Sequence, residues 1–273
     1  MTNAPSTLTE EEAIALADFA CTLAAAAAEV TLKHFRSDMS VDNKLDGNAF
    51  DPVTIADRDA ETAIRALIEQ HYPDHGILGE EYGEKSGTSQ FKWVLDPIDG
   101  TRSFISGVPL WGTLIALNDG EYPAVGVMDQ PYTGEQFVGR PGHAEFSREG
   151  QRKKLSARTR SGLSEAILGC TDPAMFTDAA ELEAFSNVSS KARLTRYGTD
   201  CYFYCLIAAG HADLVIEASM QPYDIQALIP IVEGAGGIVT NWQGGDAQNG
   251  GRIIAAGDKR VHAEALNILS RVT

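Results

Sequence analysis

The segment from Gly76 to Leu155 constrains the fold most strongly, because short runs with strand character follow one another along it. These runs read GILGE, KWVLD, WGTLIALN, YPAVGVMDQ, EQFVG and HAEFS. Asn118-Asp119-Gly120 and Tyr132-Thr133-Gly134 supply turns between neighbouring runs, and short glycine-containing connections are typical of hairpins. The sequence therefore predicts a largely antiparallel sheet over this segment.

Two helices are predicted ahead of the sheet. Thr9 and Glu12 have the spacing of a capping box and open a helix that runs to about Phe35. A second, amphipathic helix is predicted over 58–71, with Asp57 at its N-cap position. One face of this second helix carries Ala60, Ile64, Leu67 and Ile68.

After about Arg160, strands and helices alternate. The predicted strands read AILGC, RLTRY, DLVIEA, GIVTNW and RIIAAG, and the predicted helices cover residues 178–189, 199–209, 224–233 and 259–271. Such alternation favours an α/β layer. The boundary near residue 158 has no flexible linker. We therefore expect an α+β part (1–158) and an α/β part (159–273), packed as one unit with a cleft between them.

The charge of the chain restricts its partners. The 273 residues carry a formal net charge of −16, which argues against a nucleic-acid backbone or an anionic membrane surface as the main partner. An acidic protein also repels an anionic substrate unless bound cations reverse the local field.

The location of the protein is expected to be cytoplasmic. The start, MTNAPSTLTEEE, has no basic region followed by an apolar run, so no signal peptide is expected. Asp18 and Glu29 interrupt the Ala-rich stretch 13–30, which is therefore predicted to be a helix and not a membrane span. No CxxC pair occurs, which favours buried free thiols in a reducing compartment for Cys21, Cys170, Cys201 and Cys205.

The stretch LDPIDGTRSF (95–104) carries the strongest chemical signal. Pro97 pushes Asp96 toward extended geometry, so Asp96 and Asp99 are expected to converge where the strand KWVL ends. Two unpaired acids so close would drive one of them to protonate, and a divalent cation removes that cost. Hard oxygen ligands without a nearby His or Cys favour Mg²⁺ or a close relative over Zn²⁺.

The residues that follow this acid pair are suited to bind phosphate. Gly100, Thr101 and Arg102 offer backbone N–H groups at a helix start. A simpler interpretation is that Asp99-Gly100 is only a turn and Asp96 only a cap. Arg102 either contacts phosphate or only caps the helix or pairs with an acid; the stretch alone leaves these alternatives open.

Acids at three other places could face the same cleft. Gly79-Glu80-Glu81 follows the strand-like GIL, Asp57 ends the strand-like VTIA and begins a helix, and Asp224 follows Pro222-Tyr223 and opens another helix. Each also has a plainer interpretation. The acidic pair after Gly79 is ordinarily solvated, and capping alone would explain Asp57 and Asp224.

Together these spacings resemble the inositol monophosphatase family of metal-dependent phosphatases, over nearly the whole chain. The segments that carry the resemblance are DPVTIADRDAE, ILGEEYGE, WVLDPIDGTRSF, GTDCYFYCLIAAGHADLVIE and PYDIQALIPIVEGAGGIVT. The resemblance implies the family's layered αβαβα sandwich, with the site in the cleft between the halves. It also implies a homodimer and a small-molecule phosphate monoester as substrate.

Carried onto this sequence, the resemblance implies two or three Mg²⁺ ions bound together with the phosphate. The implied metal ligands are Glu80, Asp96, the Ile98 carbonyl, Asp99 and Asp224. Thr101 and Glu80 would orient the attacking water, and Asp57 would be hydrogen-bonded to Thr101. Metal-activated water attack of this kind needs no phosphoenzyme.

Substrate choice is expected to depend on the second half of the chain. The family's substrate-contacting positions fall on Gly198, Thr199, Asp200 and Glu217. The inositol-cleaving branch has a small apolar residue where this chain has Asp200, and two acids facing one leaving group suit a cationic alcohol better than a neutral polyol. Histidinol, with an ammonium and an imidazole, is such an alcohol. The alternative is that Asp200 pairs with Arg196 or Arg193 and never meets the substrate.

The residues within the motifs also favour a histidinol ester as the substrate. DGTRSFISGVPLWGTLIAL, RYGTDCYFY and QPYD resemble the histidinol-phosphate phosphatase branch, whereas the inositol branch more often reads DGTTNF and has a Trp in place of Tyr223. The implied activity is Mg²⁺-dependent hydrolysis of L-histidinol phosphate to L-histidinol and phosphate. The alternative is an inositol-1-monophosphatase or a related sugar-phosphate phosphatase. A non-catalytic phosphate-binding regulator is disfavoured, because the ligand set and the water-orienting pair are complete.

Overall fold

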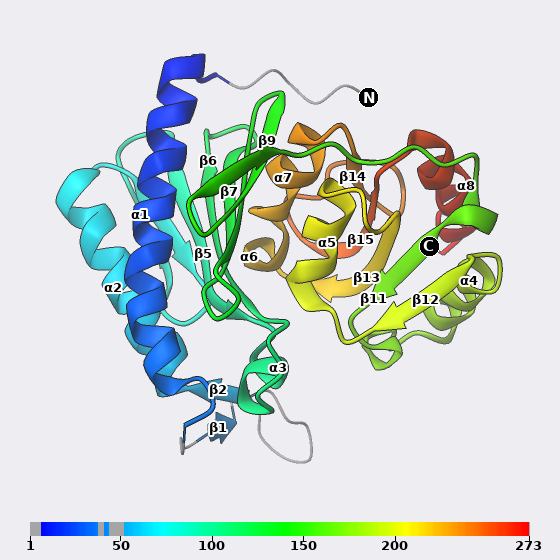
Figure 1. Cartoon of the computed structure of the whole chain (residues 1–273), viewed down its shortest axis with the longest axis horizontal. Helices are drawn as coiled ribbons and strands as arrows, with labels where there is room; N and C mark the ends of the chain where they lie inside the picture. Colours follow the sequence, from blue (N-terminus) through cyan, green and yellow to red (C-terminus); the bar gives the residue numbers. More distant parts are fainter. Residues whose placement is uncertain (1–6, 38–40, 44–51, 273) are drawn as a thin grey trace.

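The computed structural model describes residues 7–37, 41–43 and 52–272 and arranges them in layers (Figure 1). Helices α1 (Glu10–His34) and α2 (Ile55–His71) form one outer layer on an eight-stranded sheet. A short antiparallel pair, β1 (Val41–Asn43) and β2 (Pro52–Thr54), precedes α2.

The eight-stranded sheet has the order β10-β9-β8-β7-β6-β5-β3-β4. All of its pairings are antiparallel except β3 with β5. The predicted antiparallel sheet over this part of the chain is therefore confirmed. Its strands are β3 (Gly76–Gly79), β4 (Gly83–Lys85), β5 (Lys92–Asp99), β6 (Gly112–Asn118), β7 (Pro123–Gln130), β8 (Glu135–Arg140), β9 (His143–Arg148) and β10 (Gln151–Lys154).

The second sheet has five strands in the order β12-β11-β13-β15-β14. Strand β11 runs parallel to both of its neighbours, whereas β15 is antiparallel to β13 and β14. The strands are β11 (Ile167–Cys170), β12 (Leu194–Tyr197), β13 (Leu214–Met220), β14 (Ile238–Asn241) and β15 (Gly251–Ala256). Helices α4 (Ala179–Ser189) and α8 (Lys259–Leu269) cover its outer face, and two short 3₁₀ turns lie at Leu163–Glu165 and Pro173–Met175.

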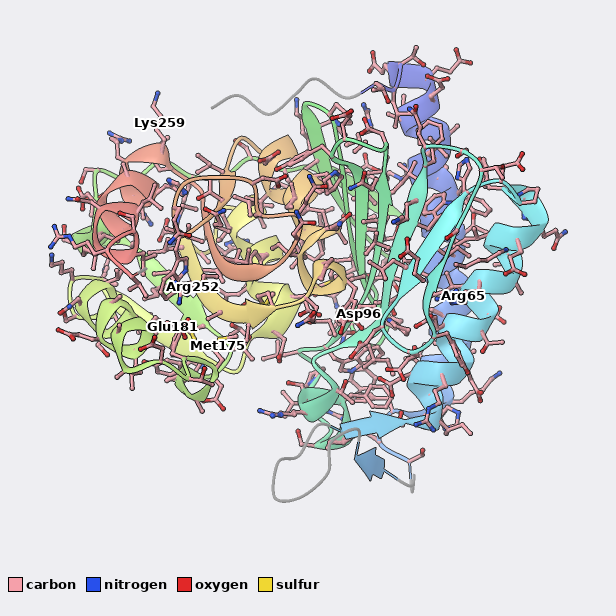
Figure 2. All side chains as sticks on the ribbon, turned by 180° about the vertical axis from the view of Figure 1, so that it is seen from behind. Arg65, Asp96, Met175, Glu181, Arg252 and Lys259 are labelled. Atoms are coloured by element: carbon pink, nitrogen blue, oxygen red, sulfur yellow. The ribbon has the colours of Figure 1, made fainter. Side chains whose placement is uncertain are left out.

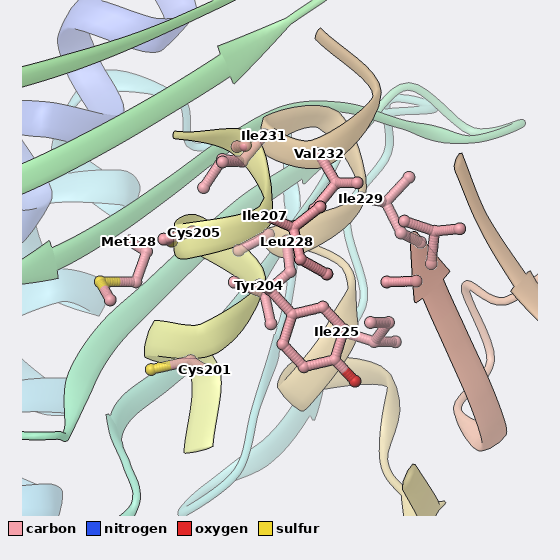
Figure 3. Packing of buried hydrophobic residues seen from close by; sticks show 14 of the residues in the cluster. Met128, Cys201, Tyr204, Cys205, Ile207, Ile225, Leu228, Ile229, Ile231 and Val232 are labelled. Atoms are coloured by element: carbon pink, nitrogen blue, oxygen red, sulfur yellow. The ribbon is translucent and has the colours of Figure 1, made fainter. Parts of the chain in front are cut away.

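A middle layer of helices separates the two sheets. It contains α5 (Asp200–Ala208), α6 (Pro222–Ile225) and α7 (Leu228–Gly234), and Figure 3 shows its buried side chains packed together. Tyr204 and Ile207 of α5 belong to one apolar cluster with Met128 of the first sheet and Val215 of the second. The expected αβαβα sandwich is thus confirmed, and burial of apolar area in this layer holds the sheets together.

Helix α1 is the one helix in the described part of the chain that is long and apolar enough to cross a membrane. In the structure its Ala20, Leu23 and Ala27 are fully buried. They pack with α2 residues and with the outward face of the eight-stranded sheet.

Two predicted helix starts were wrong. Helix α2 begins at Ile55, because the side chain of Thr54 caps it; Asp57 is therefore the third residue of a capping box and not the N-cap. The helix predicted over 224–233 begins earlier, at Pro222, and is divided into α6 and α7. Pro230 has no N–H to donate to the carbonyl of Gln226, which weakens a continuous helix at the division.

Two strand glycines allow the middle layer to approach the first sheet. A Cβ atom on Gly126 of β7 would overlap the carbonyl of Ala227, and one on Gly139 of β8 would overlap the backbone of Pro230 and Ile231. The obstacles are backbone atoms, which cannot rotate away as a side chain can.

We expect Gly139→Ala to lower the free energy of unfolding by about 1–3 kcal/mol, the usual cost of overpacking a filled core. Urea denaturation measures this effect. Gly76→Ala is the matched control, because a Cβ at that strand position meets its neighbours no closer than 3.4 Å. Equal stability of the two variants would contradict the packing argument.

Candidate active site

A cavity of about 430 Å³ lies where the two sheets and the middle layer meet. The ends of β5 and β13 open into it, together with the short helix α3 (Thr101–Ile105) and the first turns of α5 and α6. Figure 2 shows Asp96 on one side of this region and Met175, another lining residue, on the other. All the residues expected as metal ligands or phosphate contacts line the cavity: Glu80, Asp96, Ile98, Asp99, Gly100, Thr101, Arg102 and Asp224.

Strand β5 carries two of the carboxylates that line the cavity, and a β-bulge lies between them. Asp96 pairs with Leu114 and Asp99 with Gly112, so β5 has one residue more than β6 between these pairs. The Ile98 N–H donates to Asp96 Oδ1 over 3.0 Å, and Thr113 Oγ1 donates to the Pro97 carbonyl over 2.8 Å. The bulge therefore lies within a network of hydrogen bonds that fixes the directions of both acids.

The third carboxylate of the cluster comes from the middle layer. Asp224 lies in the first turn of α6, where its Oδ2 accepts the Gln221 N–H over 2.7 Å. Oxygen atoms of Asp96, Asp99 and Asp224 all lie within 4.8 Å of one another. Three hard oxygen donors at this separation can hold a divalent cation of the Mg²⁺ type.

The electrostatics of the cluster also favour a cation. Burial raises the pKa of Asp96 well above its usual range, and the charges of Glu80, Asp99 and Asp224 raise it further. Burial likewise raises the pKa of Asp99, with added repulsion from Asp200 and Asp224, although the Cys201 N–H donates to Asp99 Oδ2 over 2.8 Å. Bound positive charge would relieve this repulsion.

The loop that carries Glu80 is supported by an acid that the sequence analysis missed. Glu61 of α2 is fully buried, and its carboxylate accepts the Glu81 N–H over 2.8 Å. Arg65 pairs with it over 2.7 Å, and a Cβ on Gly79 would overlap it. The signal in the sequence was an acid on the apolar face of the helix, one turn before Ile64 and one turn after Asp57.

The hydrogen bond predicted between Asp57 and Thr101 was wrong, although both residues lie in the described part of the chain. Asp57 Oδ2 accepts the backbone N–H and the hydroxyl of Thr54, over 2.8 and 2.6 Å. The Thr101 hydroxyl donates to the Ile98 carbonyl over 3.1 Å. Capping is therefore the observed role of Asp57, whose pKa is raised by burial and by the nearby charge of Glu80.

Two acids of the second half, Asp200 and Glu217, line the same cavity as the carboxylate cluster. Asp200 accepts the hydroxyl of Ser103 at its Oδ2 over 2.9 Å. Glu217 is 2% exposed; its Oε1 accepts the Thr171 hydroxyl over 2.5 Å and its Oε2 the Tyr204 hydroxyl over 2.8 Å.

The arginine partners considered for Asp200 are not observed. Arg193 and Arg196 are exposed, and the ion pairs of the described residues include neither of them with Asp200. The cation that acts on Asp200 is Arg102, which also lines the cavity.

The other two expected substrate positions directly precede Asp200 in the chain. Gly198 and Thr199 are not among the described residues that line the cavity. The Gly198 N–H donates to the Thr171 carbonyl over 2.8 Å, and Thr199 is the N-cap residue of α5. Their position thus supports the turn that leads to Asp200.

The chain belongs to the inositol monophosphatase family, because the family model of that description matches residues 14–273. Members of this family are metal-dependent phosphatases, which agrees with the carboxylate cluster.

Similar proteins cover nearly the whole chain. A "Bifunctional phosphatase IMPL2, chloroplastic" from Arabidopsis thaliana is 42% identical, over 97% of this chain and 78% of the relative. A "Histidinol-phosphatase" from Chlorobaculum parvum is 37% identical, over 81% and 84%. A solved inositol monophosphatase structure from Zymomonas mobilis superposes with a TM-score of 0.84 at 39% identity, over 96% and 99%.

The raised pKa values of Asp96 and Asp99 predict an unusual pH dependence without metal. Between the unfolded value near 3.9 and the raised folded values, the folded protein binds more protons than the unfolded chain. In EDTA, stability should therefore fall as the pH rises through the folded values, and Mg²⁺ should reverse this loss.

Asp99→Asn tests the same repulsion. It should raise the melting temperature in EDTA at alkaline pH by roughly 2–4 °C, the shift that 1 kcal/mol produces in a protein of this size. It should also remove most of the stabilisation by Mg²⁺. Thermal melts at acidic and alkaline pH, with EDTA or MgCl₂, measure both effects. Two results together would count against the repulsion. The metal-free protein would become more stable toward alkaline pH, and Asp99→Asn would lower the melting temperature there.

Glu61 is expected to act on metal binding through the Glu80 loop. Glu61→Gln should weaken Mg²⁺ binding by about tenfold, the low end of effects seen for groups that orient metal ligands. Calorimetric titration with MgCl₂ measures the affinity. Glu69→Gln is the control, since Glu69 lies on the same helix in an exposed pair with Lys85. Unchanged affinity in Glu61→Gln would exclude this positioning role.

Proposed function

We propose that this protein is a Mg²⁺-dependent phosphomonoesterase that hydrolyses L-histidinol phosphate to L-histidinol and phosphate, a step of histidine biosynthesis. The observation that carries the proposal is the pair of acids, Asp200 and Glu217, in the same cavity as the carboxylate cluster. An ester with an ammonium on its leaving group would place opposite charge against both acids. The name of the Chlorobaculum parvum relative agrees with this substrate.

The residues of the cavity fit the metal that the family implies. Asp96, Asp99 and Asp224, with Glu80 and the Ile98 carbonyl, would hold two or three Mg²⁺ ions. When bound, such ions supply the acidity that makes water a nucleophile near neutral pH and the positive charge that stabilises a leaving alkoxide.

The protein groups around the phosphate have complementary tasks. Glu80 would accept a hydrogen bond from the attacking water, and Thr101 would form a second hydrogen bond that orients the same water. The backbone N–H groups of Gly100 and Thr101, with the Arg102 guanidinium, would bind the phosphate oxygens. Asp57 acts only indirectly, by capping the helix that carries Glu61.

The leaving group would occupy the part of the cavity formed by the second half of the chain. Asp200 and Glu217 would face its ammonium, and Met175 and Tyr223 line the same cavity with apolar surface against which an imidazole can pack. A cytoplasmic location and a homodimer belong to the same proposal.

The second candidate is an inositol-1-monophosphatase or a related sugar-phosphate phosphatase. The observation that favours it is the similarity to the Zymomonas mobilis inositol monophosphatase structure. The metal cluster serves both candidates equally, because it contacts the phosphate and not the alcohol.

Phosphate release separates the candidates. With Mg²⁺, we expect kcat/KM for L-histidinol phosphate to exceed that for myo-inositol 1-phosphate and fructose 1,6-bisphosphate by at least about tenfold, and EDTA should abolish all release. Asp200→Asn should lower the preference by about tenfold, the value of one charge-assisted contact. Glu183→Gln, on the exposed side of α4, controls for net charge. A preference for a polyol or sugar phosphate would reject histidinol phosphate as the substrate.

A further inference from the structure

Ser103 connects helix α3 to Asp200, an acid from the second half of the chain that lines the cavity. It lies in α3, and its hydroxyl donates to Asp200 Oδ2 over 2.9 Å, although the two residues are 97 positions apart in the sequence. Ser103 is not among the described residues that line the cavity. Asp200, which does line the cavity, is the residue through which Ser103 is connected to it.

The carboxylate of Asp200 is confined from several sides. Its φ of +40° lies in the left-handed region, which is unfavourable for a residue with a Cβ. Its side chain lies over Gly100, where an added Cβ would come within 3.1 Å of Asp200 Cγ. The next N–H, that of Cys201, is bound to Asp99. The backbone is thus fixed, and the Ser103 bond fixes the remaining rotation of the carboxylate.

This last bond has a competitor. The positive charge of Arg102 acts on Asp200, as does the Ser103 hydrogen bond; both lower its pKa against the opposing effect of burial. Arg102 lines the cavity on the phosphate side. Without the Ser103 bond, no other described hydrogen bond would hold the Asp200 carboxylate against the attraction of this charge.

We propose that Ser103 is a positioning residue for substrate selectivity: it keeps Asp200 directed at the ammonium of the leaving group and away from Arg102. The proposal rests on the proposed function, since it concerns an amine-bearing phosphate ester. Oδ1 of Asp200 has no hydrogen-bond partner among the described residues, so the bond to Ser103 leaves one oxygen available for the ammonium.

The test compares two side chains of the same shape, in Ser103→Thr and Ser103→Val, because only the first keeps a hydroxyl. The substrates are L-histidinol phosphate and desamino-histidinol phosphate, the same ester without its ammonium. In Ser103→Val we expect KM for L-histidinol phosphate to rise about tenfold with kcat within about twofold. KM for the desamino ester should change by less than about twofold. Ser103→Thr should restore the wild-type values.

Ser106→Ala is the control at the C-cap of the same helix, because the Ser106 hydroxyl donates to the Arg102 and Ser103 carbonyls and not to Asp200. Ser103→Ala replaces Ser103→Val where the larger side chain prevents folding. Equal losses for both esters, or a fall in kcat alone, would overturn the proposal and leave Ser103 as a support of α3.

The parent enzyme is measured in the same assay. If it hydrolyses neither ester, the proposed function fails, and the role of Ser103 fails with it. If it hydrolyses both equally well, the ammonium is not recognised and the role of Ser103 is rejected, whereas hydrolysis of L-histidinol phosphate still stands. If it prefers L-histidinol phosphate and Ser103→Val keeps that preference, only the role of Ser103 is rejected.

Discussion

The repulsion among Asp96, Asp99 and Asp224 is the interaction on which the arrangement of this protein depends. The first two acids come from β5 and the third from α6, so folding must bring like charges together from two segments that are far apart in the sequence. Their oxygens lie within 4.8 Å of one another, and burial strengthens the repulsion. Apolar burial elsewhere has to offset this cost until a cation removes it, which links metal binding to the stability of the fold.

The middle layer supplies that offset and also sets the geometry of the site. One apolar cluster joins Met128 and Phe137 of the first sheet to α5, α7 and the strands of the second sheet. The glycines of β7 and β8 allow this layer to approach the first sheet at backbone distance. This packing fixes the positions of the first turns of α5 and α6 relative to the end of β5. The positions of Asp200 and Asp224 therefore depend on apolar contacts outside the cavity.

Local patterns predicted much of the fold and of the candidate site. Strand periodicity and turn residues predicted the antiparallel sheet, and the Asp-Pro-Ile-Asp spacing predicted two convergent acids, because neighbouring residues decide both. The errors arose where a more distant or competing partner decides. Asp57 is held by Thr54 and not by Thr101, and Glu61 gains its role from a loop about twenty residues further along. The partner of Asp57 lies within its own segment, in a capping box, whereas no pattern within one segment contains the loop that Glu61 supports.

The two acids of the second half are not equivalent, although no sequence pattern ranks them. Both oxygens of Glu217 accept hydrogen bonds, from Thr171 and Tyr204, so a new donor would have to share an occupied carboxylate. Among the described residues, one hydrogen-bond donor, Ser103, reaches Asp200, and it binds one oxygen. An ammonium would then form its direct contact with Asp200 and feel Glu217 mainly as buried negative charge. On this argument, selectivity depends on how the Asp200 carboxylate is oriented more than on how many acids surround the leaving group.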